Sequence, residues 1–162
     1  MQRPAERNLA RRIVRLVCRE LAPEGFKLTK PTFACRPGQF ATAFFHFHKF
    51  SFAPAFRIHV GIRVMSDPFE AIALNGPWDE HAGRFSEHEE DIRACVVAMV
   101  RYCYEQGLDW IDRWNDPWKL LRAPDSPLGA RERDALVDLL EGRPNQKWIS
   151  QSERLLGLRD VH

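Results

Sequence analysis

Residues 39–65, QFATAFFHFHKFSFAPAFRIHVGIRVM, decide the fold of this 162-residue chain. Aromatic and β-branched residues fill two runs here, and such residues suit the pleated surface of a β-sheet. In the second run, 56–65, apolar side chains occupy every even position from Phe56 to Val64, and the polar Arg57, His59 and Arg63 lie between them. This period of two predicts a strand with one packed face and one polar face.

The first run, 39–50, is aromatic on both faces. Phe44 and Phe50 share one face, and Phe45 and Phe47 share the other. Apolar side chains on both faces predict a central strand that is covered on both sides.

Weaker signals flank these two strands. Pro37-Gly38 favours a turn, since proline presets φ and glycine accepts a positive φ. Before it, residues 27–35 predict a strand that Pro31 restricts to an edge or a bulge. After residue 65, a short fourth strand over 69–74 is expected to end at Asn75-Gly76-Pro77.

Segments with helical periodicity precede and follow the predicted strands in the sequence. Residues 4–22 carry a one-sided apolar stripe, and their other faces are rich in arginine. A capping box of Ser86 and Glu89 predicts the start of a central helix that ends near Gly107. Further helices follow, the last over 146–156 with Gly157 as its C-cap. We therefore expect one α+β domain over 1–162: a helix (1–25), a three- to four-stranded antiparallel sheet (26–75), and a helical half packed on it (86–157).

Composition narrows the class of protein. The chain is 44% hydrophobic and 28% charged, which is typical of a globular domain. Charged residues interrupt every apolar run before the roughly 18 residues that a membrane span needs. The four cysteines lack CxxC spacing, and the arginine-rich N-terminus lacks the apolar core of a signal peptide. A cytoplasmic protein with reduced thiols is the expectation.

The net charge of +2 is a cancellation. Residues 1–63 hold twelve Lys and Arg against three acids, a balance of +9, and the remainder holds twelve against nineteen, a balance of −7. Arginines concentrate on the first helix, and eight acids against Arg84 alone lie between residues 66 and 91.

The order of features up to residue 65 resembles a bacterial domain-of-unknown-function family. The resemblance rests on the N-terminal helix, Gly25-Phe26 followed by Lys27, and the strands FFHFHK (44–49) and FRIHVGI (56–62). The chain departs from the family pattern at His46 and His48, where polar residues are usual. The resemblance carries no catalytic residues. Small proteins of this kind are often similar to immunity proteins encoded beside toxins, which is an implication of analogy.

Three histidines are the weak candidates for a metal site. His46 and His48 share a strand face, and His59 on the next strand comes near them if the register allows. Zinc accepts three imidazoles. However, no HExxH motif occurs, and no carboxylate in 39–65 is available to orient a ring. We expect structural histidines, no metal and no cofactor.

Enzyme motifs are sparse. The serines lack a GxSxG elbow, and the glycines do not form a phosphate-binding loop. Catalysis is therefore not the leading hypothesis, although a small metal-dependent enzyme around the three histidines stays an alternative. A second alternative is a nucleic-acid-binding module, in which the arginine-rich first helix contacts phosphates and aromatic side chains of the sheet stack on bases.

The acidic segment supports the leading hypothesis. It predicts a non-enzymatic interaction protein, most concretely an immunity protein that neutralises a basic toxin. The expected contact residues are Trp78, Asp79, Glu80, Glu87, Glu90 and Asp91. This hypothesis requires that the acidic segment be displayed, not paired with the arginine-rich helix.

Overall fold

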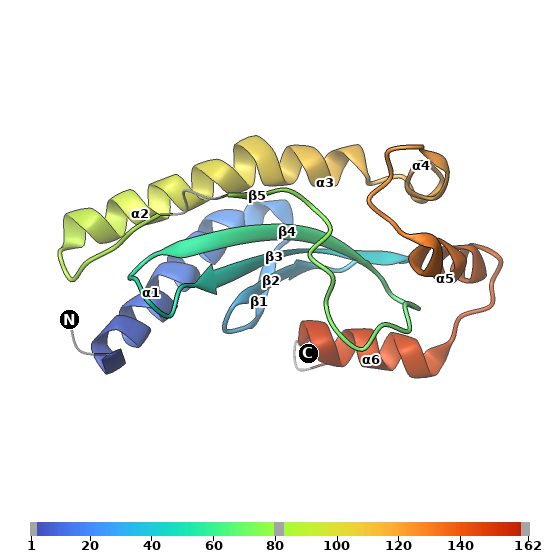
Figure 1. Cartoon of the computed structure of the whole chain (residues 1–162), viewed down its shortest axis with the longest axis horizontal. Coiled ribbons are helices and arrows are strands. Elements are labelled where there is room, and N and C mark those ends of the chain that lie inside the picture. Colours follow the sequence, from blue (N-terminus) through green and yellow to red (C-terminus); the bar gives the residue numbers. More distant parts are fainter. Residues whose placement is uncertain (1–2, 80–82, 160–162) are drawn as a thin grey trace.

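A computed structural model describes residues 3–79 and 83–159. One antiparallel sheet lies at its centre, with the strands side by side in chain order (Figure 1). The strands are β1 (Lys27–Lys30), β2 (Phe33–Arg36), β3 (Ala41–Lys49), β4 (Phe56–Val64) and β5 (Trp78–Asp79). Because β3 is third of five, the central position predicted from its two aromatic faces is confirmed, as is the α+β class.

Two strand predictions were wrong in detail. The expected edge strand over 27–35 is a hairpin, because Pro31 and Thr32 form a turn between β1 and β2. The expected strand over 69–74 does not form. Backbone carbonyls in this segment accept hydrogen bonds from Arg63, which draws the segment over the sheet instead of beside it. The fifth strand is Trp78–Asp79, which pairs with β4.

Helices surround the sheet (Figure 1). They are α1 (Arg3–Leu21), η1 (Ala22–Glu24), α2 (Glu89–Tyr102), η2 (Cys103–Leu108), α3 (Asp109–Arg113), α4 (Pro117–Arg122), α5 (Ala130–Leu140) and α6 (Gln146–Leu156). The last matches its predicted bounds, and Gly157 caps it with a φ of 71°. The capping-box prediction was wrong, since α2 begins at Glu89. Ser86 accepts a hydrogen bond from the His88 N–H and donates one to Asp91, so it organises the preceding turn.

The central helix continues past its expected end. A π-helical turn, η2, joins α2 to α3, and Gly107 in that turn packs on the Phe45 ring. A Cβ at this position would lie 2.3 Å from a ring carbon of Phe45, so the close approach needs glycine. Among the residues that the structure describes, no helix is long and apolar enough to cross a bilayer.

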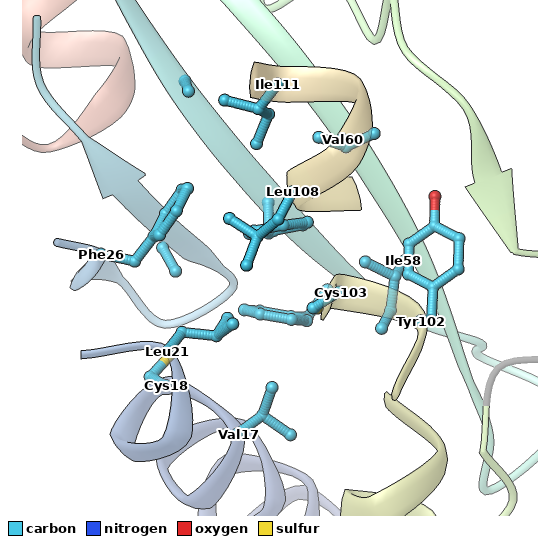
Figure 2. Close-up of a cluster of buried hydrophobic side chains, with 14 of the residues drawn as sticks. Val17, Cys18, Leu21, Phe26, Ile58, Val60, Tyr102, Cys103, Leu108 and Ile111 are labelled. Carbon is cyan, nitrogen blue, oxygen red and sulfur yellow. The ribbon is translucent and has the colours of Figure 1, made fainter. Parts of the chain in front are cut away.

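One face of the sheet forms the main core. Ile58 and Val60 of β4 meet Val17 and Leu21 of α1, and side chains of η2 and α3 close the same cluster (Figure 2). The even-numbered apolar positions of β4 lie here, as their alternation predicts.

Only part of the opposite face is covered. Leu156 of α6 packs with Cys35, Phe44 and Met65 over one end of the sheet. Arg63, predicted to point outward, is 4% exposed at this end. It lies on the predicted polar face, but α6 and the segment after β4 cover it. The other end of this face carries the candidate site.

Candidate functional site

Strand register places a row of ring-bearing side chains on the less covered end of the sheet. His46 lies opposite Phe33 on β2 and opposite His59 on β4, and His59 in turn lies opposite Trp78 on β5. Residues directly opposite in an antiparallel pair share a face. Four strands therefore contribute to one surface, which we call the aromatic ladder. It consists of Phe33, His46, His48, Phe50, Phe52, Arg57, His59 and Trp78.

Neighbouring rings in the ladder are in stacking range. Phe33 and His46 have centroids 4.6 Å apart, His46 and His59 5.9 Å, and His59 and Trp78 6.5 Å. At the far end Phe50 and Phe52 stack at 5.1 Å with an interplanar angle of 24°. Aromatic pairs at 4.5–7 Å attract each other beyond their area burial.

Arg57 links the two ends of the ladder. Its guanidinium carbon lies 5.2 Å from the Phe50 ring centroid and 4.6 Å from that of Trp78. Both contacts are in the range of cation–π attraction. The arginine is thereby held between two rings, which reduces the entropy that it would lose on meeting a partner.

Part of the ladder is exposed to solvent. Phe52 is 83% exposed and Trp78 is 45% exposed. His48 is also exposed. Exposed apolar side chains that gather in one patch, unlike those that occur singly, mark candidate interaction surfaces.

The three histidines form one cluster, as their spacing predicts. Burial, and then the nearby His59 and His48, lower the pKa of His46 to about 4. Burial also lowers the pKa of His59. The His46 Nδ1 atom is buried with no hydrogen-bond partner among the described residues. Neutral imidazoles are therefore the state of His46 and His59 at physiological pH.

The ring centroids of the three histidines lie 5.9–6.5 Å apart. Over residues 3–79 and 83–159, no group of three His, Cys, Asp or Glu side chains is placed to hold a metal ion.

The structure describes four of the five predicted acidic contact residues. Asp79 pairs with Ile58, so it lies on the core face of the sheet, and Glu80 lies outside the described residues. The remaining members, Glu87, Glu90 and Asp91, are exposed at the start of α2. Of the predicted set, Trp78 belongs to the aromatic ladder.

Charges of the two oppositely charged segments partly pair. Both terminal nitrogens of Arg12 on α1 bond the Glu89 carboxylate on α2, at 2.6 and 3.0 Å. Asp67, another of the eight acids, is 2% exposed and accepts a hydrogen bond from Arg131. The acidic segment is therefore less displayed than its sequence suggests.

Cations adjoin the ladder instead. Arg3 and Arg7 from the first turns of α1 line a pocket of about 380 Å³ together with Phe50 and Phe52. Lys49 lines it too and pairs with Glu6.

Sequence reasoning missed Phe52 and the stacking of Arg57. Strand parity places Arg57 and His59 on one face, but Phe52 follows the end of β3 at Lys49, so parity gives no signal for it. Predicting the stack also required the register, which the connection between β3 and β4 sets. No protein-family model matches the chain, and the searches of curated proteins and of solved structures gave no match either.

Proposed function

We propose that this chain is a non-enzymatic protein-binding protein of the immunity type, which neutralises a toxin by covering it, and that the aromatic ladder is its contact surface. The observation that carries the proposal is the stack of Trp78, Arg57, Phe50 and Phe52 on an open sheet face. Tryptophan, tyrosine and arginine dominate the binding energy of protein interfaces, and phenylalanine is enriched there.

The positive charge around the ladder favours a partner with an acidic surface. Arg57 is the charged member of the ladder, and Arg3 and Arg7 adjoin its Phe52 end. A partner segment with an apolar centre and acidic groups beside it complements this surface. The proposal thus keeps the protein partner expected from the sequence and changes its charge, from a basic toxin surface to an acidic one.

Single-stranded nucleic acid is the second candidate ligand, because the ladder offers rings for base stacking and Arg3 and Arg7 lie at one end. The arrangement favours a protein. The core-facing residues Val17 and Leu21 place the rest of α1 against the other face of the sheet, so a strand stacked on the ladder cannot follow the arginine-rich helix.

The proposal is tested by binding to the product of a toxin-like reading frame, if sequencing finds one beside the gene for this chain. Trp78→Ala should weaken the complex about 30-fold or more, as expected for the loss of a central anchor worth about 2 kcal/mol. Titration calorimetry on purified proteins measures the dissociation constant.

The chain offers a matched control at Trp118. This side chain is 47% exposed and also stacks under an arginine, Arg122, at 4.7 Å, but it lies on α4. Trp118→Ala should leave the affinity within about twofold. Equal affinities for the parent and the Trp78→Ala protein overturn the proposal, and salt-sensitive binding of a labelled oligonucleotide that needs Trp78 favours the second candidate.

A further inference from the structure

A hollow lies on the core face of the sheet, away from the aromatic ladder. Along β3 the residues on this face change from Ala41 and Ala43 at one end to Phe45 and Phe47 at the other. The two phenylalanines fill the space beneath α1 and η2, whereas the two alanines leave space beneath α3 and α4. The sequence of one strand therefore creates the hollow.

The hollow is a pocket of about 360 Å³ with an apolar floor and a polar mouth. Ile62, Ile111, Leu120 and Leu136 form its buried base, each at most 5% exposed, and the half-buried Phe40, Ala41 and Pro117 provide its accessible apolar lining. The exposed Gln39 and Asn115 and the half-buried Arg36 lie at its edge. This volume, apolar lining and small number of polar groups are typical of small-molecule sites.

Arg36 is the charged residue of the lining. Its guanidinium stacks on Phe26 at 5.0 Å, and one terminal nitrogen donates to the Glu24 carbonyl oxygen. The other terminal nitrogen is 3.6 Å from Asp112, a carboxylate 69% exposed to solvent. An ion pair this open contributes little, and a guanidinium has five N–H donors, so Arg36 has donors left for a ligand.

We propose that this pocket binds a small monocarboxylate with an apolar tail, such as a medium-chain acyl acid, with the tail against Phe40, Ala41 and Pro117 and the carboxylate on Arg36. Arginine and carboxylate form strong, charge-assisted hydrogen bonds, and the apolar floor supplies the affinity for the tail. No bond is made or broken.

Trp114 provides the sensor for a test. Its indole lines the pocket, and its Nε1–H is buried with no acceptor among the described residues. In a ¹⁵N-labelled protein the indole resonance of Trp114, assigned with Trp114→Phe, should shift saturably when octanoate is added below its micellar concentration. Octanoate should bind more tightly than 1-octanol, which shares the tail and lacks the charge.

Two variants test the apolar contact with the tail and the charged contact with the carboxylate separately. Ala41→Leu fills the hollow from the sheet side and should abolish the octanoate shift, with a thermal midpoint at or above that of the parent. Arg36→Gln should weaken octanoate binding about tenfold and leave 1-octanol binding unchanged. An unmoved Trp114 resonance, an Ala41→Leu protein that still binds, or equal affinities for octanoate and 1-octanol each overturn the proposal. Trp78→Ala should not alter octanoate binding, so this test is independent of the proposed protein interface.

Discussion

His46 shows how the environment of a single side chain makes stability depend on pH. The pKa of its imidazole falls to about 4 in the folded chain, chiefly through burial, against an unfolded value near 6.5. Below about pH 6.5 the unfolded chain therefore binds a proton that the folded chain refuses until about pH 4. The stability that His46 contributes is fully present above pH 6.5 and is lost as the pH falls toward 4.

A His46→Phe protein should lack this contribution. Phenylalanine keeps a ring against Phe33 and removes both the titration and the unpaired Nδ1 atom. Between pH 7.5 and pH 5 the free energy of unfolding of the parent should fall by about 1 kcal/mol more than that of the variant, a value reduced for solvent screening. Urea unfolding at the two pH values measures this difference.

His88→Gln serves as the control, since His88 is exposed at the start of α2. It should preserve the pH response of the parent. If His46→Phe also preserves it, the imidazole of His46 titrates normally and the description of the cluster as neutral is wrong.

Among the elements, α6 and the segment after β4 depend on one arginine. The Arg63 side chain donates to Ser152 on α6 at 2.7 Å and to three backbone carbonyls of the connecting segment, at 2.8–3.0 Å. A buried guanidinium that satisfies four acceptors holds two elements on the sheet at once. Its loss removes the donor to Ser152, Ala71 and Asp67, whereas the Phe69 carbonyl keeps a hydrogen bond from Gln151.

Arg63→Met should therefore lower the free energy of unfolding by about 3–5 kcal/mol, although methionine fills much of the same volume. Denaturant unfolding measures the loss, and hydrogen exchange should show α6 deprotected first. Arg143→Met is the matched control. That arginine is 62% exposed and pairs with Asp138 and Glu141, so its loss should cost less than about 1 kcal/mol. A small loss at Arg63, comparable to that at Arg143, contradicts this account.

Elements with a strong local pattern were predictable from the sequence. The alternation of β4, the double aromatic face of β3 and the Gly157 cap of α6 are local, and the structure has all three. The wrong predictions concern segments whose structure depends on residues far away in the sequence. The local sequence of residues 69–74 predicts a strand, but two of their backbone carbonyls accept hydrogen bonds from Arg63 instead of from a neighbouring strand. The pairing that makes Trp78–Asp79 a strand depends on β4.

Across the whole molecule, the candidate site was only half predictable for the same reason. Parity along one strand puts His46 and His48 on a common face, and this needs no tertiary information. The position of Trp78 beside His59, and the clamp on Arg57, exist only once β4 and β5 pair. The segregation of charge in the sequence likewise gives no sign that Arg12 and Glu89 meet.

The aromatic ladder and the acidic segment are alternative partner surfaces. Glu89 at the start of α2 pairs with Arg12 of α1, and Trp78 and Phe52 of the ladder are open to solvent. The two surfaces predict different sensitive residues, so one set of variants decides between them.

The most direct test is neutralisation in cells that express this chain together with a toxin-like reading frame, if one is found beside its gene. The parent should restore growth, Trp78→Ala and Phe52→Ala together should abolish the rescue, and Glu87→Lys and Glu90→Lys together should leave it intact. Undiminished rescue by the Trp78→Ala and Phe52→Ala protein, at equal expression, would contradict the assignment of the aromatic ladder as the partner surface.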